Sequence, residues 1–588
     1  MFTLARNAKL WRYLAGLLAV GYVGLLIFYT APIAIEADQC SYFAAARYIA
    51  DDGAFHYRDF INQETVGYFF VIVNEKFYPH FGVGYPLLLA ATIKIFGAGA
   101  EYYFTTVCAG LVVLAMYAFS RLFLPRLYAF LGAFLLVASP TFFFNAQIKN
   151  THTLGVLLTL IALYALLATA RRAIKTTKIA DDERSIAGAA LCGFLLGYNV
   201  LVHYTEILLL LAPLTYVLTA RKLRRRWTLL AAGVGGAAMP LAWLGLWHYA
   251  HFGSPFKTSY SFYTGASNNF SLAYFVENLW LYLPGMCNYG LGVAGGALAL
   301  AVGLKFRGVK TAPNWFWLAW ILPLGLAYHF YFWSSPDLYP LMLRYWEPFF
   351  PALIIVGLIG LRQLWRDYQN RVSPKFAAGL LAGFIALQFL WSVTFTAPSA
   401  EMLYGAYQRA YRQVCFITQQ VPSGAFLFAP YPEKNAPVCD NEIVMQHRWH
   451  FFVENVFELQ KFQDKQRAEY EKREKNYGNT APHTEQTLST ERMLRRSPDV
   501  MFASFYRQLR GAAAAGVPMY YVGNVETYPH FQEIAGQYFE MGEPYAFDDF
   551  KINYRLFPQG KRSAASRPPV KTELPKMLIV PLRLKDES

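Results

Sequence analysis

Long apolar blocks separated by short polar segments dominate the first 400 residues of the chain. About 20 apolar residues of helix cross the hydrocarbon core of a bilayer, and a helix bonds its own backbone polar groups. The pattern therefore predicts about eleven or twelve membrane-spanning helices. The apolar blocks lie at residues 13–35, 101–120, 127–139, 151–170, 186–202, 205–220, 228–249, 284–304, 314–332, 347–361 and 376–396, with a shorter one at 83–98.

The pattern changes after residue 397, where polar and charged residues return and the Leu-rich blocks end. A charged stretch at 461–496 is typical of a solvated helix and loop. The remaining segments predict helices at 400–420 and 507–515, strands at 425–429, 499–504 and 517–522, and an edge strand at 577–582. The predicted fold is a polytopic α-helical membrane domain, residues 1–397, followed by an extramembrane α/β domain, residues 398–588.

Composition supports this assignment, because 55% of the residues are hydrophobic and only 15% are charged, against about 25% charged in soluble domains. A soluble enzyme, a disordered protein and a fibrous repeat are excluded. The net charge of +15 does not indicate a nucleic-acid partner, because most basic residues before position 375 cluster between apolar blocks. The clusters lie at 121–126, 171–178, 221–226, 305–310 and 362–375.

Basic clusters of this kind mark the cytoplasmic ends of membrane helices. With a cytoplasmic N-terminus, the loops at 36–82, 140–150, 203–206, 250–283 and 333–346 fall on the outer face. Everything after about residue 398 falls there too. We therefore expect the functional site at the outer face of the membrane.

The first outer loop provides a candidate catalytic carboxylate. Asp38 follows the first span directly, so its carboxylate would lie at a fixed depth beside a lipid headgroup. An alternative role for Asp38 is the N-cap of a helix at 39–51, and the two roles can coexist. Glu36, Gln39 and Asp59 are further candidates for the pocket or the acceptor site.

A second candidate cluster opens a late span, with Arg344 and Tyr345 shortly before Pro348. An arginine at this position can bind a phosphate through a fixed fork of donors. Its alternatives are snorkelling to the interface or an ion pair with Glu347 at helical spacing.

The loop at 140–150 carries a lysine against the positive-inside rule, which indicates that Lys149 binds an anion. Further pocket candidates in the outer loops are Asn150, His152, His203 and Glu206.

The six cysteines show no metal-binding spacing, so no zinc site is expected. Cys415 and Cys439 both lie in the predicted external domain, where oxidation permits a disulfide if the geometry allows it.

The order of these features resembles the GT-C superfamily of integral membrane glycosyltransferases, and within it the branch of protein O-mannosyltransferases and lipid A aminoarabinose transferases. The resemblance extends over about the first 400 residues. Family members commonly carry Asp-Glu where this chain has Asp38-Gln39, which makes a divalent metal possible but not favoured. The motifs on which the resemblance rests are Ile35-Glu36-Ala37-Asp38-Gln39, His80-Phe81-Gly82-Val83-Gly84-Tyr85-Pro86-Leu87, Ala138-Ser139-Pro140, Phe252-Gly253-Ser254-Pro255-Phe256, and Arg344-Tyr345 ahead of Pro348 and Pro351.

The resemblance implies transfer of a sugar from a polyprenyl-phosphate donor to a lipid, glycan or protein acceptor, with inversion at the anomeric carbon. It implies no certain cofactor. Asp38 would accept the proton of the acceptor hydroxyl. Arg344, helped by Lys149, Lys76 or His80, would stabilise the departing phosphate. Surrounded by membrane lipids, the protein is expected in a bacterial inner membrane with its site on the periplasmic side.

Two other functional classes stay open. A transporter or flippase of lipid-linked sugars would typically show two related halves with helices broken at matching positions, and the sequence shows no such halves. An O-antigen ligase or polymerase also uses polyprenyl-linked sugars but places its chemistry in a large late loop. The long first loop with Asp38 argues against the ligase.

Overall fold

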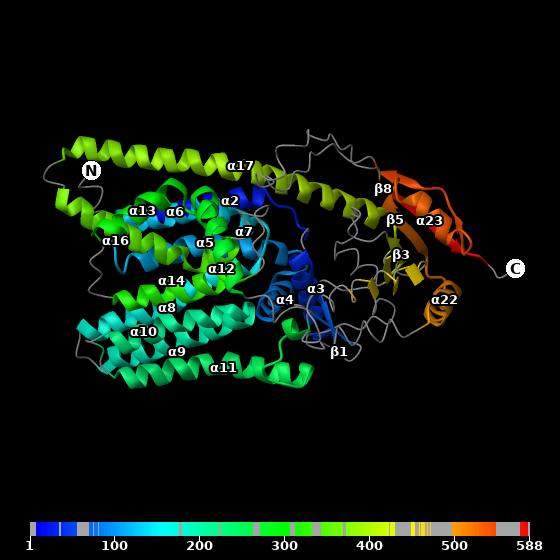
Figure 1. Ribbon diagram of the computed structural model, residues 1–588, viewed down its shortest axis with the longest axis horizontal. Coiled ribbons are helices and arrows are strands. Elements are labelled where there is room, and N and C mark those ends of the chain that lie inside the picture. The colour runs from blue at the N-terminus through cyan, green and yellow to red at the C-terminus, as the bar shows by residue number, and fades with distance from the viewer. Residues whose placement is uncertain are drawn as a thin grey trace.

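A bundle of helices with a small sheet domain at one end forms the molecule in this computed structural model (Figure 1). Helix α3 (Ala37–Asp52) lies at the end of the bundle nearest the sheet, and we call this end the α3 end. The structure describes residues 8–34, 37–55, 70–73, 76–79, 81–175, 179–220, 223, 225–262, 271–305, 312–331, 343–368, 372–422, 424–429, 449–452, 458, 460–461, 463–464, 467–468, 471, 497–547 and 577–585.

Each predicted apolar block forms helix over most of its length. In the described part of the chain, seven helices are long and apolar enough to cross a membrane, or up to eight if the bent pair α6–α7 counts as one span. The predicted eleven or twelve spans thus correspond to these helices plus shorter apolar ones, and the chain is an integral membrane protein. The helices of the bundle are α2 (Ala8–Phe28), α4 (Gly84–Phe96), α5 (Glu101–Ser120), α6 (Arg126–Val137), α7 (Pro140–Gln147), α8 (Thr151–Lys175), α9 (Ile179–Val202), η1 (Tyr204–Leu210), α10 (Leu211–Thr219), α11 (Arg226–Phe252), η2 (Ser259–Phe262), α12 (Leu272–Gly285), η4 (Met286–Gly290), α13 (Gly292–Lys305), α14 (Asn314–His329), η6 (Leu343–Phe349) and α16 (Phe350–Tyr368).

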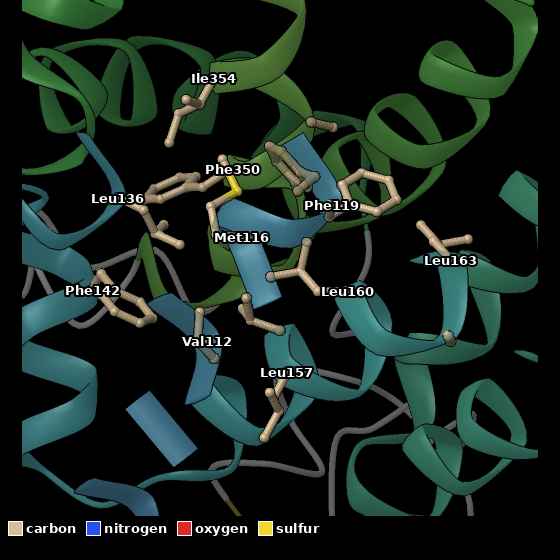
Figure 2. Packing of buried hydrophobic residues seen from close by; sticks show 14 of the residues in the cluster. Val112, Met116, Phe119, Leu136, Phe142, Leu157, Leu160, Leu163, Phe350 and Ile354 are labelled. Carbon is tan, nitrogen blue, oxygen red and sulfur yellow. The ribbon is translucent and has the colours of Figure 1, made fainter. Parts of the chain in front are cut away.

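The core of the bundle is aliphatic and aromatic. Met116 of α5, Leu160 of α8 and Phe350 of α16 belong to one buried cluster (Figure 2). Inside a membrane such packing stabilises the bundle mainly through van der Waals contact, because lipid tails are as apolar as these side chains. The cluster therefore fixes α8 and α16 relative to each other, and both helices lead to the candidate site.

Glycines allow α9 and α11 to pack backbone against backbone. A Cβ atom on Gly193 would meet the carbonyl oxygen of Gly233, and one on Gly236 would meet the carbonyl oxygen of Ala190. Small residues are the usual interface of closely packed membrane helices. This contact sets the direction of α9, and His203 follows directly after its last residue.

Arginines gather at the end of the bundle opposite the sheet domain. Arg171 donates a hydrogen bond to the carbonyl of Leu122, and Tyr128 interacts electrostatically with Arg362 and Arg366. The N-terminus lies at this end as well (Figure 1). These basic groups therefore share one side of the membrane, as the positive-inside rule requires, and the assignment of that side to the cytoplasm stays a prediction.

Helix α3 confirms the helix predicted at 39–51 and is anchored to the bundle by an ion pair. Arg47 Nη2 lies 2.8 Å from Glu101 Oε1, and the Glu101 side chain is fully buried. The other carboxylate oxygen of Glu101 accepts a hydrogen bond of 2.7 Å from the backbone of Gly99. The first outer loop also contains an antiparallel hairpin of β1 (Phe70–Val73) and β2 (Lys76–Pro79).

A single helix, α17 (Pro374–Gln420), merges the span predicted at 376–396 with the helix predicted at 400–420. Its 47 residues correspond to about 70 Å at 1.5 Å per residue. It therefore crosses the bundle and continues into the sheet domain (Figure 1). Pro398 lies within the helix without ending it, so the predicted domain boundary at residue 397 falls inside a continuous element.

The sheet domain is α/β, as predicted. Its strand order is β4-β3-β5-β8-β6, with β7 also pairing with β8. Strand β3 pairs in parallel with β4 and β5, whereas β8 is antiparallel to β5, β6 and β7. The elements are β3 (Phe426–Ala429), β4 (Trp449–Phe452), α22 (Pro498–Ala514), β5 (Met519–Asn524), α23 (Tyr528–Ala535), β6 (Phe539–Met541), β7 (Tyr545–Phe547) and β8 (Met577–Leu584).

Two predictions for this domain are wrong. The segment 499–504 belongs to helix α22, whose buried Phe505 and Leu509 have the i, i+4 spacing of one helical face. Strand β8 is an interior strand rather than an edge strand, because it pairs with β5 on one side and with β6 and β7 on the other.

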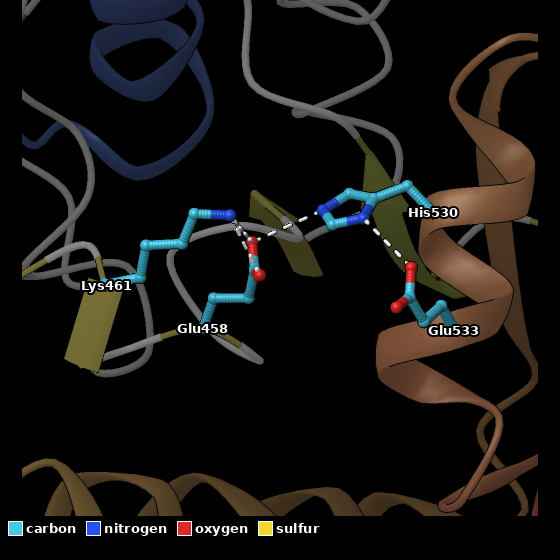
Figure 3. A network of polar contacts seen from close by, with 4 residues as sticks. All are labelled: Glu458, Lys461, His530 and Glu533. Atoms are coloured by element: carbon cyan, nitrogen blue, oxygen red, sulfur yellow. Dashed lines mark hydrogen bonds and ion pairs between the residues drawn. The ribbon is translucent and has the colours of Figure 1, made fainter.

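A polar network at the surface, centred on the half-buried Glu458, joins α23 to the segment around residue 458. Lys461 Nζ donates to Glu458 over 3.2 Å, and His530 Nε2 lies 3.3 Å from the same carboxylate (Figure 3). His530 Nδ1 lies 3.8 Å from Glu533. Because exposed ion pairs contribute only about 0–1 kcal/mol, this network adds little to the stability of the domain.

Candidate active site

Two groups of polar residues meet at the α3 end, on either side of the connection between α7 and α8. Ser139 caps the start of α7 by accepting a hydrogen bond from the backbone of Phe142, and Pro140 occupies the first turn. At the other end of α7, Lys149 has a left-handed φ of 56°. This conformation helps to end one helix and begin the next within three residues, Ile148, Lys149 and Asn150.

Lys149 holds the segment that leads to Asp38. The side chain is buried, and its Nζ donates hydrogen bonds to the carbonyls of Ala31 at 2.6 Å and Ile33 at 2.8 Å. The ammonium also lies 4.2 Å from the ring centroid of Tyr407. Lys149 therefore fixes the exit of the first span, and its predicted role as an anion ligand stays a prediction.

Gln39 anchors the first turn of α3. It is completely buried, and its Nε2 donates to the carbonyl of Ile148 and lies 3.0 Å from Tyr407 Oη. Tyr407 in turn donates to the carbonyl of Gln147 over 3.1 Å. Helix α3 is thus tied to the end of α7 and to α17, and Asp38 lies in the turn that these bonds hold.

The remaining first-loop predictions are only partly covered by the structure. Glu36, Asp59 and His80 lie outside the described residues. Of Asp38 the backbone is described, inside the first turn of α3 rather than before it. Lys76 is half-buried in strand β2 of the hairpin.

The second group brings together residues that are far apart in the sequence. His152 lies in the first turn of α8, His203 lies between α9 and η1, and Tyr345 lies in η6. The His152 ring centroid is 5.1 Å from that of His203 and 5.5 Å from that of Tyr345. Arg344 Nη2 donates to Tyr345 Oη over 3.2 Å. The predicted phosphate ligand Arg344 and three predicted pocket residues, His152, His203 and Tyr345, therefore share one site.

The electrostatics of this group suit an anion. Arg344 and His152 are buried, with 9% and 5% of their surfaces exposed. Burial, together with the nearby Arg344 guanidinium, lowers the pKa of the His203 imidazole to about 4. At neutral pH, His203 is therefore uncharged and can donate one hydrogen bond without repelling Arg344.

Asn150 connects the two groups. Its Nδ2 donates to Asn145 Oδ1 over 2.8 Å, and its Oδ1 accepts from the backbone N–H of His152 over 3.1 Å. The residue before it, Lys149, contacts the exit of the first span. The three consecutive residues Ile148, Lys149 and Asn150 thus set the distance and orientation between the Asp38 turn and the Arg344 group.

Two buried carboxylates lie in the elements that carry this group, Glu206 in η1 and Glu347 in η6. Glu206 Oε2 is 3.5 Å from Asn199 Nδ2, and both carboxylate oxygens of Glu347 have no hydrogen-bond partner among the described residues. Glu206 was predicted as a pocket residue, whereas the sequence presented Glu347 only as an ion-pair partner for Arg344.

Sequence reasoning missed Tyr407, Thr205 and Tyr328, each of which contacts a predicted site residue. A tyrosine or threonine in an apolar helix gives no local signal of its partner, so these contacts emerge only from the packing of distant helices. Among the described residues, no group of three or more His, Cys, Asp or Glu side chains could hold a metal ion.

Comparisons with known proteins find the same combination of a helical membrane bundle and a small C-terminal domain. Residues 82–244 match the sequence model of the family described as dolichyl-phosphate-mannose-protein mannosyltransferase. That segment includes Lys149, Asn150, His152, His203 and Glu206. A search of curated proteins finds no match.

Solved structures share this architecture at low sequence identity. ArnT from Cupriavidus metallidurans bound to undecaprenyl phosphate is 12% identical with a TM-score of 0.56, and the alignment covers 98% of each chain. Its apo structure is 14% identical with a TM-score of 0.56, covering 97% of this chain and 98% of that one. The apo Archaeoglobus fulgidus oligosaccharyltransferase is 13% identical with a TM-score of 0.48, covering 91% and 73%.

The matched segment and the fold shared with ArnT agree with the resemblance to the GT-C superfamily of glycosyltransferases that the sequence shows.

Proposed function

We propose that the protein transfers a sugar from a polyprenyl-phosphate-linked donor to an acceptor at the outer face of the membrane. One observation carries this proposal: the connection 148–150 contacts the turn of Asp38 on one side and leads into the Arg344 group on the other. A base and an anion site held at a fixed separation are what displacement of a lipid phosphate needs. The undecaprenyl phosphate bound to ArnT supports the donor class.

The mechanism follows from the chemistry of the donor. A sugar on a lipid phosphate has a leaving group that is already stable as an anion, so the departing oxygen needs no general acid. The acceptor hydroxyl needs a base, and Asp38 would accept its proton as the new bond forms. Arg344 would stabilise the phosphate as charge builds on it, with Lys149, Lys76 or His80 as helpers. Direct displacement inverts the anomeric carbon.

The position of the sheet domain supports a role in acceptor binding, because it lies at the α3 end with the site (Figure 1). We propose that this end faces the periplasm of a bacterial inner membrane. The acceptor belongs to one of three classes, lipid, glycan or protein.

The test is release of free polyprenyl phosphate from lipid-linked sugars by the purified protein in detergent. Asp38→Asn should lower kcat about 100-fold or more, the effect expected for losing a general base. Arg344→Ala should cause a similar loss, and Arg344→Lys a smaller one, because lysine keeps the charge but not the bidentate fork.

Matched controls are Asp52→Asn, exposed at the far end of α3, and Arg366→Ala, exposed at the opposite end of the bundle. Both should keep full activity. Wild-type activity that survives Asp38→Asn would assign the base to another residue. If no lipid-linked sugar is consumed with any acceptor class, the flippase alternative is favoured and is examined by transport of the same lipids in proteoliposomes.

A further inference from the structure

A chain of three polar side chains lies beside the anion site. His203 Nδ1 is 2.7 Å from Thr205 Oγ1, and Thr205 Oγ1 is 2.5 Å from Tyr328 Oη. Both distances are those of good hydrogen bonds. Because Thr205 lies in η1 and Tyr328 in α14, the chain connects the break after α9 to a separate helix.

The donor and acceptor strengths of the three groups indicate which atom donates in each of these two hydrogen bonds. Threonine has one hydroxyl hydrogen and can donate to only one of its two neighbours. The Tyr328 phenol is a stronger acid than an aliphatic hydroxyl, and an imidazole nitrogen is a better acceptor than a phenol oxygen. The favoured order is therefore Tyr328 to Thr205 to Nδ1 of His203. In a neutral ring whose Nδ1 accepts, the hydrogen is on Nε2.

The hydrogen-bonded series of His203, Thr205 and Tyr328 is packed against the Arg344 group. The Tyr328 ring stacks on Tyr345 with a centroid distance of 4.5 Å, and Tyr345 accepts the hydrogen bond from Arg344. The His203 ring lies 6.5 Å from Tyr345 and 5.1 Å from His152. His203 itself is only partly buried.

Two ring nitrogens face the question of a ligand at this site. The hydrogen bond of His203 within the described residues uses Nδ1, which leaves Nε2 for another partner. The buried His152 Nδ1 has no partner among the described residues, and such a nitrogen beside a buried arginine is costly unless a ligand satisfies it. An anion with several oxygens, such as a phosphate, fits beside Arg344 and His203.

We propose that His203 donates a hydrogen bond from Nε2–H to a phosphate oxygen of the lipid donor, and that Thr205 and Tyr328 are positioning residues that hold His203 in this tautomer. This inference rests on the proposed glycosyltransferase function and adds a catalytic residue to it. A neutral donor suits the position, because an imidazolium would repel the adjacent guanidinium.

In the transfer step the bond between the anomeric carbon and the phosphate oxygen breaks, and its electron pair stays on that oxygen. The acceptor oxygen bonds to the anomeric carbon, and its proton passes to Asp38. His203 keeps its proton throughout and stabilises the growing negative charge. Removing one such fixed donor typically lowers kcat about 100- to 1,000-fold.

The kinetic test compares variants of His203 with variants of Thr205 and Tyr328, the two residues hydrogen-bonded behind it. His203→Ala should lower kcat about 100-fold, and His203→Gln should recover part of this loss because its amide N–H can approach the position of Nε2–H. Thr205→Val and Tyr328→Phe should lower kcat with little change in the donor KM. Thr205→Ser, which keeps the hydroxyl, should have a kcat close to that of wild type. The matched control is Thr215→Val, which should match wild type, because Thr215 is a half-buried threonine of α10 whose hydroxyl donates to the backbone carbonyls of Leu211 and Ala212.

Two measurements report on the tautomer and on binding without turnover. NMR of the protein labelled with 15N-histidine, with His203→Gln for assignment, should show His203 with a protonated Nε2 and a bare Nδ1. Affinity for undecaprenyl phosphate should fall about 10-fold or more in His203→Ala, in line with losing one hydrogen bond to a charged group.

The opposite tautomer, or unchanged affinity for undecaprenyl phosphate in His203→Ala, would overturn the inference. Full transfer activity in His203→Ala would overturn it while leaving the proposed function intact. Failure of the wild type to use any lipid-linked sugar would instead count against the proposed function, and the binding measurement would still decide whether His203 contacts a lipid phosphate.

Discussion

At the scale of single residues, Lys149 illustrates how a charge inside a membrane protein organises its surroundings. Its ammonium is solvated by the carbonyls of Ala31 and Ile33 and by the faces of tyrosine rings. A buried cation must be compensated locally because the low dielectric makes an isolated charge costly. The compensation here fixes the backbone a few residues before Asp38.

We expect Lys149→Met to lower both the melting temperature in detergent and kcat, because two backbone carbonyls lose a charged donor. Hydrogen bonds to charged groups contribute about 1.5–3 kcal/mol each. Differential scanning fluorimetry and donor kinetics measure the two effects, with Lys94→Met, exposed in the last turn of α4, as the control. An unchanged melting temperature with a raised donor KM would instead support the anion-binding role predicted from the sequence.

At the scale of elements, the contact between α9 and α11 places His203. Small residues let the two backbones meet, so the end of α9 is held in a defined position beside η1 and α14. The hydrogen-bonded chain from Tyr328 to His203 depends on that position, because its two bonds bridge elements that no local interaction would bring together.

Substitution on α11 tests this contact with two neighbouring glycines. Gly236→Leu should push the helices apart and destabilise the protein, since overpacking costs about 1–3 kcal/mol. Gly235→Leu should have little effect, because a Cβ there meets nothing within 4 Å. Melting temperatures in the same detergent give the comparison. Equal values for the two variants would show that the α9–α11 contact tolerates separation.

At the scale of the whole molecule, bundle and sheet domain share a core. One buried cluster contains Ile33 and Ile148 from the bundle, Tyr407 and Ile417 from α17, and Ile579 from strand β8. The sheet domain is therefore part of the same packed structure that supports the Asp38 turn. This explains why α17 continues without interruption through residue 397.

Truncation after residue 397 should accordingly yield a protein that is not monodisperse in size-exclusion chromatography. It removes Tyr407 and Ile417 from their contacts with Ile33 and Ile148 and exposes an apolar surface outside the membrane. Glu458→Gln, which perturbs only the surface network of Figure 3, should elute like wild type. A monodisperse truncated bundle that binds undecaprenyl phosphate normally would show that the two parts fold independently.

The sequence by itself determined the class of the protein. Apolar blocks of spanning length, basic clusters between them and the end of the apolar blocks after residue 397 follow from the solvent that each segment faces, which is a local property. The same holds for Asp38, Lys149 and Arg344 as candidates, because an ionisable residue beside an apolar block is conspicuous wherever it lies. The sequence misread 499–504 as a strand because a short apolar run is ambiguous between helix and strand.

Only the tertiary structure decided which residues meet. His152, His203 and Arg344 come from different helices, and the partners of Lys149 are backbone carbonyls that no motif can encode. The tautomer proposed for His203 depends on Thr205 and Tyr328, whose bonds form only after α9 and α14 have packed. The physical reason is that solvent preference acts residue by residue, whereas hydrogen bonding between distant helices depends on the packing of the whole bundle.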